Sequence, residues 1–206
     1  MLESINQIPI TCKVILVGDS GVGKTSIIGR FINKYNEKEK TTIGASFSNK
    51  TNIIDNYKIS FDIWDTSGQE RFRSVNTIFY KEAYICILVY DIPKLESFNS
   101  IKNYWYKTII ENCPSGIIFG LAANKNDLYE IEKVNQNEVK EYCKSINALF
   151  FSTSAVLNSS IDEMFITLWK KFITSNIFNQ LKDKAIENEK KKVDLKNKNN
   201  KKKNCC

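Results

Sequence analysis

The sequence lacks the features that direct a chain into or across a membrane. Its first residues, Met1–Ser4, carry no basic stretch followed by an apolar one, so we expect no signal peptide. Leu2 stands where N-myristoylation requires a glycine. The longest apolar run, Ala83–Tyr90, is far too short to span a bilayer. We therefore expect the chain to be made and kept in the cytosol.

Paired cysteine spacings of the kind that bind metals are also lacking. Four of the six cysteines are scattered, and Cys12 and Cys86 lie in apolar runs, where they are expected to be small buried hydrophobes. A reducing cytosol disfavours disulfides. The other two cysteines, Cys205 and Cys206, end the sequence and need a separate explanation.

Most of the chain lacks an excess of charge. The formal net charge is +7, but residues 179–206 hold ten lysines against four acidic residues, which leaves 20 basic against 19 acidic residues elsewhere. A folded nucleic-acid-binding domain should carry its positive charge on one of its faces. The sequence therefore speaks against nucleic acid as a partner.

One motif dominates what is present. Gly18–Thr25 fits the pattern G-x-x-x-x-G-K-[ST] without a mismatch, after the apolar run Cys12–Val17 and before apolar residues at helical spacing. Glycines allow successive N–H groups to turn inward at a helix start and hold an anion. Lys24 adds a positive charge for terminal phosphates, and Thr25 offers a hydroxyl to Mg²⁺. The motif predicts a phosphate-binding loop between a strand and a helix.

Strands and helices alternate along the chain, which predicts an α/β fold with a six-stranded, mostly parallel sheet flanked by helices. Apolar and alternating runs predict strands at 12–17, 50–55, 57–65, 84–90, 117–123 and 148–152. Helical spacing predicts helices at 24–33, 94–112, 135–146 and 161–172. The short connection at Asp55–Asn56 predicts an antiparallel hairpin. We divide the chain into a leader (1–11), one folded domain (12–178) and a disordered tail rich in Lys and Asn (179–206).

Four of the predicted strands end in polar motifs. These motifs are Gly18–Thr25, Asp65–Glu70, Asn124–Asp127 and Thr153–Ala155. In sheets of this class, ligands bind beyond the carboxyl ends of the strands. The repeated arrangement therefore predicts one shared site more strongly than any single motif does.

Together these motifs resemble those of the small GTPases of the Ras superfamily, and most closely the Rab family. The resemblance covers about Cys12 to Phe172 and rests on Gly18–Thr25, Thr42, Asp65-x-x-Gly68-Gln69, Asn124-Lys125-x-Asp127 and Thr153–Ala155. Three further segments are similar to Rab segments, namely Ile43–Phe47, Arg71–Ser74 and Tyr90–Ile92.

The resemblance implies a phosphate-loop GTPase fold that binds GTP and GDP. Asp127 would accept the N1–H and 2-amino donors of guanine and would reject adenine, whose N1 is an acceptor. Asn124 is expected on the N7 side of the base, the stem of Lys125 along the ring face, and the Ala155 N–H at O6. The implied nucleotide-binding set is Ser20, Gly21, Val22, Gly23, Lys24, Thr25, Ser26, Tyr35, Thr42, Gly68, Asn124, Lys125, Asp127, Ser154 and Ala155, with Tyr35 against the edge of the base.

The resemblance also implies Mg²⁺, which prefers octahedral oxygen ligands. Thr25 and Thr42 would supply hydroxyls directly, and Asp65 would act through a water. Gly68 would give its N–H to the γ-phosphate.

Catalysis would rest on Gln69, which would orient the attacking water, together with Lys24 and Thr42. No arginine matches the position of a charge-supplying finger. We therefore expect slow intrinsic hydrolysis, raised on the order of 10³–10⁵-fold by a GTPase-activating protein.

Loss of the γ-phosphate would release the two segments that hold Thr42 and Gly68, which makes the chain a switch. Effectors would read the GTP form through a surface that we expect around Ile43, Phe47, Trp64, Phe72 and Phe79. An exchange factor, a GDP-dissociation inhibitor and a prenylation escort with its transferase are the other partners that the resemblance implies.

Three positions depart from the family pattern. Val156 stands where the family usually has a lysine that helps to cover the base. Ser67 stands where it usually has alanine, beside the catalytic glutamine. The stretch Lys24–Thr42 is about one residue shorter than usual, which makes the assignment of Tyr35 depend on the alignment.

The tail ends in Cys205–Cys206, as in Rab chains that receive two geranylgeranyl groups. Two lipid chains anchor a protein stably, and the lysines at 190–192 and 201–203 would add attraction to anionic lipid. We expect the chain on the cytosolic face of intracellular membranes, cycling with the cytosol, in vesicle-mediated traffic. The segment Thr42–Phe47 resembles the endosomal branch.

Three alternatives remain open at the level of sequence. An ATP-using phosphate-loop enzyme would conflict with Asp127, and nucleotide competition would decide. A non-hydrolysing scaffold of the same fold would conflict with Gln69, and phosphate release would decide. A nucleic-acid binder conflicts with the position of the charge in the tail.

Overall fold

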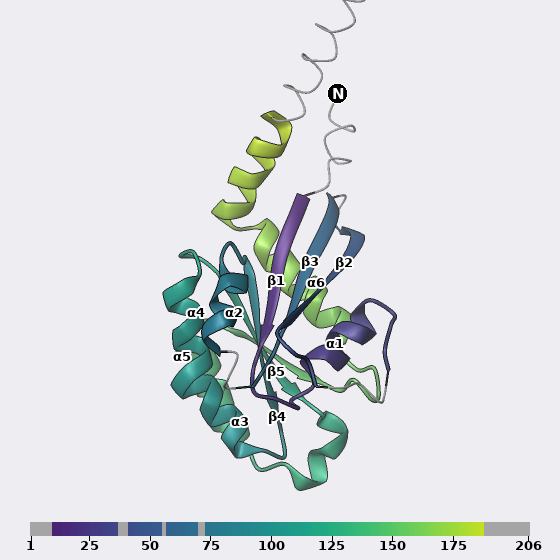
Figure 1. Cartoon of the computed structure of the whole chain (residues 1–206), viewed down its shortest axis with the longest axis vertical. Helices are drawn as coiled ribbons and strands as arrows, with labels where there is room; N and C mark the ends of the chain where they lie inside the picture. The colour runs from purple at the N-terminus through teal and green to yellow at the C-terminus, as the bar shows by residue number, and fades with distance from the viewer. Residues whose placement is uncertain (1–9, 37–40, 55–56, 70–72, 188–206) are drawn as a thin grey trace, which may run out of the picture.

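A single six-stranded sheet organises the chain, in the order β2-β3-β1-β4-β5-β6 (Figure 1). The computed structural model describes residues 10–36, 41–54, 57–69 and 73–187. The strands are β1 Ile10–Val17, β2 Ala45–Ile54, β3 Tyr57–Thr66, β4 Ile85–Asp91, β5 Ile118–Asn124 and β6 Leu149–Thr153. All neighbouring strands pair in parallel except β2 and β3, which form the expected antiparallel hairpin. The predicted α/β class is confirmed.

Helices cover both faces of the sheet, with α1 and α6 on one side and α2 to α5 on the other (Figure 1). The helical elements are α1 Lys24–Phe31, α2 Arg73–Tyr80, α3 Leu95–Ser100, η3 Ile101–Trp105, α4 Tyr106–Asn112, η4 Asn126–Ile131, α5 Gln136–Ser145 and α6 Ile161–Ile173. The side chain of Asn135 caps α5 by accepting from the N–H groups of residues 137 and 138. No helix in the described ranges is both long enough and apolar enough to cross a bilayer.

The strand β1 shows why the sheet lies in the core. Alternate side chains point to opposite faces of a strand. Cys12, Val14 and Leu16 are buried under α1 and α6, whereas Ile15 and Val17 are buried in the other cluster. A strand buried on both faces needs a continuous apolar run, which is what the sequence provides. Cys86 is likewise fully buried, as expected.

Several predicted boundaries are wrong. β1 begins at Ile10, so the last two residues of the predicted leader belong to the sheet. β2 begins at Ala45 because the hairpin pairing continues as far as Ala45 opposite Thr66. The predicted helix 94–112 is three segments in direct succession, with a π-helical turn, η3, in the middle. The short 3₁₀ helix η4 was not expected from the sequence.

The prediction of a disordered tail from Asn179 is wrong for residues 179–187, which continue a helix over 176–187 (Figure 1). Phe178 is buried against Trp169 and Phe172, with ring centroids 5.7 and 5.8 Å apart, and Leu181 packs on the same core. The apolar contacts of this helix explain why its lysines do not prevent folding. The rest of the predicted tail, residues 188–206, lies outside the described residues.

We therefore predict that packing of the helix over 176–187 on the core contributes to the stability of the domain. In the full chain, Phe178→Ala should remove about 3 kcal/mol of stability. For a domain of this size that corresponds to a fall in Tm of roughly 6–12 °C. The Tm would be measured at constant saturating GDP. Gln180→Ala, at an exposed position of the same helix, is the matched control, and an equal Tm for both variants would contradict the packing role of Phe178.

Candidate functional site

The predicted phosphate loop joins β1 to α1 and depends on two of its glycines. Gly18 has a φ of 147°, and a Cβ there would lie 2.1 Å from the Val89 carbonyl oxygen. Gly23 has a φ of 98°, and a Cβ there would lie 2.2 Å from Asn124 Nδ2. Both close approaches exclude any side chain. Through them the loop packs directly against the neighbouring strand ends.

The loop borders a cavity of about 250 Å³ at the carboxyl edge of the sheet. Its lining comes from segments that are far apart in sequence: Ser20, Gly21, Gly23, Lys24, Thr25, Ser26, Thr41, Thr42, Thr66, Gly68 and Lys125. The start of α1 contributes its first three residues, and a helix N-terminus favours anions. The structure thus brings the loop and the predicted Thr42 and Gly68 together around one space.

Lys24 is buried at the floor of this cavity, with 6% of its surface exposed. Its ammonium donates to the carbonyl oxygens of Gly18 at 2.7 Å and Asp19 at 2.9 Å. Burial lowers the pKa of Lys24 to about 8, although the negative charges of Asp65 and Asp19 oppose the shift. A phosphate at this position would supply the counter-charge that the ammonium lacks.

The three predicted metal ligands meet in a cluster of oxygens. Thr25 Oγ1 donates to Asp65 Oδ2 at 2.6 Å, and Thr42 Oγ1 donates to the same atom at 3.1 Å. The two hydroxyls are 2.9 Å apart. The described residues contain no cluster of three or more His, Cys, Asp or Glu side chains. An all-oxygen set with a single carboxylate fits Mg²⁺ that is also held by phosphate oxygens.

The segment after β3 lies against the phosphate loop. A Cβ on Gly68 would lie 2.3 Å from the Asp19 carbonyl carbon and 2.4 Å from the Ser20 nitrogen, so only glycine fits. Ser67 is fully buried, and its N–H donates to the Gly44 carbonyl oxygen at 2.7 Å. The Gln69 N–H donates to Ser67 Oγ at 3.3 Å. These contacts join the segment to the chain that follows Thr42.

The predicted base motif is a network between two strand ends. Asn124 is buried; its Nδ2 donates to the Val22 carbonyl oxygen at 2.7 Å, and its Oδ1 accepts from Thr153 at 3.1 Å. Ser154 Oγ donates to Asp127 at 2.5 Å. Ala155 is buried beside it. The motif therefore fixes the phosphate loop, Asp127 and the segment 153–155 relative to one another.

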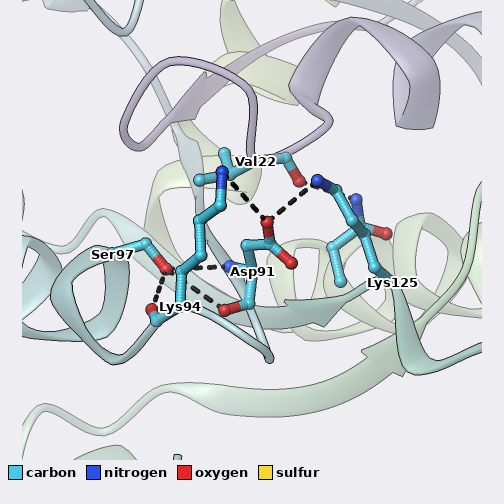
Figure 2. A network of polar contacts seen from close by, with 6 residues as sticks. Val22, Asp91, Lys94, Ser97 and Lys125 are labelled. Carbon is cyan, nitrogen blue, oxygen red and sulfur yellow. Dashed lines mark hydrogen bonds and ion pairs between the residues drawn. The ribbon is translucent and has the colours of Figure 1, made fainter. Parts of the chain in front are cut away.

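Asp91 is a residue of the site whose role sequence reasoning missed. Its buried carboxylate accepts from Lys125 Nζ at 2.9 Å, and Lys94 Nζ approaches the same oxygen at 3.8 Å from the other side (Figure 2). The Asp91 N–H donates to Ser97 Oγ at 3.0 Å. Lys125 has a φ of 64°, and its ammonium is held by Asp91. The sequence gives one signal for it: the segment Tyr90–Ile92 resembles a Rab segment, but that resemblance assigns no role to Asp91.

Tyr35 does not line the cavity among the described residues. The guanidinium of Arg30 lies over its ring, with the central carbon 3.4 Å from the ring centroid. Arg30 also reaches the carbonyl oxygens of Ala155 and Val156. Tyr35 is thus connected to the base side of the site through Arg30, a residue that no sequence motif singled out.

The predicted recognition surface is partly exposed. Ile43 and Phe47 are exposed by 76% and 54%, and half-buried Trp64 stacks on Phe79 with ring centroids 5.2 Å apart. Phe47 meets Trp64 edge-on at 5.3 Å. Phe72 lies outside the described residues. Phe47, Trp64 and Phe79 thus form a connected row of aromatic rings, and Ile43 is exposed on the same chain segment as Phe47, a feature that partners can bind.

The buried state of Lys24 generates a prediction about protons. Without nucleotide its pKa is about 8, and bound phosphate should restore the charged form. Binding of GDP at pH 9 should therefore take up close to one proton, and binding at pH 7 almost none. Calorimetry in two buffers of different ionisation enthalpy measures this uptake.

The same pKa fixes the sign of the stability change. Between about pH 8 and 10.5 the unfolded chain holds a proton that the folded chain lacks, so the nucleotide-free protein gains stability as the pH rises. Lys24→Arg, which stays charged throughout, is the control. Absence of proton uptake on GDP binding at pH 9 in the unmodified chain would contradict the lowered pKa of Lys24.

The Asp91 network generates a second prediction. Asp91→Asn removes the buried counter-charge of Lys125, whose side chain is 32% exposed, and should accelerate GDP dissociation roughly tenfold, because a hydrogen bond to a charged group contributes about 1.5 kcal/mol. Lys94→Ala removes a cation that is 60% exposed and should change the rate less than twofold. A fluorescent GDP analogue would report both rates. Equal GDP dissociation rates for the two variants would contradict the prediction that Asp91 matters more than Lys94.

Comparisons with known proteins agree with this geometry. Residues 13–174 match the Ras family. The chain is 42% identical to Ras-related protein Rab-22A of Homo sapiens over 160 residues, which cover 77% of this chain and 82% of that protein. It is 44% identical to Ras-related protein Rab-31 of Rattus norvegicus over 154 residues (74% and 78%), and 36% identical to GTP-binding protein ypt3 of Schizosaccharomyces pombe over 176 residues (85% and 79%). The chain therefore belongs to the Ras family, as a small GTPase of the Rab type.

Proposed function

We propose that this chain is a magnesium-dependent GTP-hydrolysing switch of vesicle traffic whose two states differ at the oxygen cluster of Thr25, Thr42 and Asp65. Membership of the Rab family makes the chain a GTPase switch in vesicle traffic. The observation that carries the finer proposal is the meeting of three oxygen groups from three segments, within 3.1 Å, at the edge of the cavity.

Two of these groups would bind Mg²⁺ directly. In the proposed GTP form, Thr25 and Thr42 would supply their hydroxyls to the metal, and Asp65 would act through a water. Bound Mg²⁺ would neutralise negative charge on the β- and γ-phosphates. The contact of Thr42 with the metal would form only when the γ-phosphate is bound, so it would depend on the nucleotide state.

The phosphates would be bound by the loop Ser20–Ser26. Backbone N–H groups at the start of α1 and the ammonium of Lys24 would supply positive charge to the phosphates. When Lys24 turns to the phosphates, it gives up its bonds to the carbonyls of Gly18 and Asp19. The exchange leaves the ammonium paired with a full negative charge.

Gln69 would orient the attacking water, with Gly68 as the N–H donor to the γ-phosphate. Gly68 already lies against the phosphate loop, so a small displacement would bring its N–H to the γ-phosphate. No arginine is among the described residues that line the cavity. We therefore propose that a GTPase-activating protein supplies the missing charge.

Guanine would be selected by Asp127 and the segment 154–155. The Asp127 carboxylate accepts the two donors on one edge of guanine, and Ser154 Oγ holds the carboxylate in place. The Ala155 N–H would meet O6, and the stem of Lys125, fixed by Asp91, would lie on the ring face. ATP offers an acceptor where Asp127 needs a donor, so it should not compete.

Rab membership implies regulators and effectors in general. We propose that effectors bind the strip of Ile43, Phe47, Trp64 and Phe79, and that an exchange factor and a GDP-dissociation inhibitor complete the cycle. A prenyl transferase and its escort would modify Cys205 and Cys206, which lie outside the described residues. The lipids would place the chain on the cytosolic face of endosomal membranes, as the segment Thr42–Phe47 suggests.

The role of Gln69 gives the test of the hydrolytic mechanism. Gln69→Leu should slow single-turnover GTP hydrolysis at least about tenfold, which is 1.4 kcal/mol of lost transition-state stabilisation. GDP affinity should stay within twofold, and excess ATP should not inhibit the unmodified chain. Ile78→Ala, at an exposed position in the nearby α2, is the control. Unchanged hydrolysis by Gln69→Leu would contradict the proposed role.

A further inference from the structure

We propose that Arg30 is a positioning residue for the guanine-binding segment Ser154–Val156, and that Tyr35 holds Arg30 in this role. The proposal rests on the proposed recognition of guanine O6 by Ala155 and adds residues from α1 and from the chain that follows it. Arg30 belongs to the helix that opens at the phosphate loop, so it can connect the phosphate side of the site to the base side.

The guanidinium of Arg30 binds two successive carbonyl groups of the segment. Its Nε donates to the Ala155 oxygen at 2.5 Å, and its Nη2 donates to the Val156 oxygen at 3.1 Å. Hydrogen bonds from an ionised donor are stronger than neutral ones, and a planar fork fixes direction as well as distance. A lysine at this position would offer a point charge without that geometry.

Tyr35 covers one face of the same guanidinium, at 3.4 Å between the guanidinium carbon and the ring centroid. A cation over an aromatic ring is attracted to it. Tyr35 is half-buried and packs against the apolar core under α1, so the ring is a fixed platform. The guanidinium therefore has its edge on the carbonyls and its face on the ring.

Gly29 allows Tyr35 to lie so close to the helix. The Lys34 N–H donates to the Gly29 carbonyl oxygen at 2.7 Å, which turns the chain back at the end of α1. A Cβ at position 29 would lie 3.2 Å from the Tyr35 Cα, closer than most real contacts. The chain after α1 thus packs directly on the helix and carries Tyr35 under Arg30.

Other bonds shape the segment, but Arg30 ties it to α1. Ser154 exchanges backbone hydrogen bonds with Ser159, and the Leu157 N–H donates to Ser154 Oγ at 3.0 Å. These local bonds set the internal shape of the loop. Asn124 holds the Thr153 end of the segment at the phosphate loop, and the bonds from Arg30 hold the Ala155–Val156 end at α1. In the proposed complex this second tie would help to set the distance between the O6 contact and the phosphates.

The test compares GDP with 6-thio-GDP, which keeps both donors for Asp127 but replaces the O6 acceptor by a larger and weaker sulfur. The full chain should prefer GDP. Arg30→Gln should weaken GDP binding roughly tenfold or more, because charge-assisted bonds are lost, and should reduce the preference for GDP by a similar factor. Affinity for 6-thio-GDP should change less than twofold. Arg30→Lys should recover only part of the preference.

Tyr35→Leu and Tyr35→Phe provide a second test that keeps Arg30 intact. The first should reduce the preference for GDP, and the second should retain it because the ring remains. An equal loss of affinity for both nucleotides in the Arg30 and Tyr35→Leu variants, or no loss, would overturn the inference. If the unmodified chain does not distinguish GDP from 6-thio-GDP, the failure lies instead with the proposed O6 contact of Ala155.

Discussion

The oxygen cluster of Thr25, Thr42 and Asp65 is the contact on which the rest of the site depends. One buried carboxylate oxygen accepts from two hydroxyls that come from the start of α1 and from the chain before β2. The cluster thus adds a side-chain link between three segments: the start of α1, the chain before β2 and the end of β3. Because the same oxygens suit Mg²⁺, the proposed change of nucleotide would act on all three segments together.

The two sides of the site differ in how they are held. On the base side, Asn124, Asp127, Asp91 and Arg30 form hydrogen bonds that connect the strand ends to the phosphate loop and to α1. On the γ-phosphate side, the oxygen cluster and a backbone bond from the Ser67 N–H to the Gly44 carbonyl oxygen connect the segments that hold Thr42 and Gly68. The γ-phosphate side thus depends on oxygen groups that Mg²⁺ and a phosphate would rearrange, which is what a nucleotide switch requires.

The sequence predicted the sheet, the hairpin and the motifs at the strand ends, because each depends on residues that are close together in the chain. It did not predict Arg30 or Asp91, whose partners are 125 and 34 residues away. Such pairings depend on the folded geometry, and a lone arginine on a helix carries no local signal. The helix at 176–187 is not predicted because residues 179–206 as a whole are rich in Lys and Asn, although Ile177, Phe178 and Leu181 of this helix pack on the core.

Amide hydrogen exchange at Thr42 and Gly68 tests the central claim most directly. It would be compared between the GDP form and the form with Mg²⁺ and a non-hydrolysable GTP analogue. The account predicts that both amides are strongly protected only with the analogue, while the amides of Asn124 and Ala155 are protected equally in both forms. Equal exchange at Thr42 and Gly68 in the two forms would contradict it.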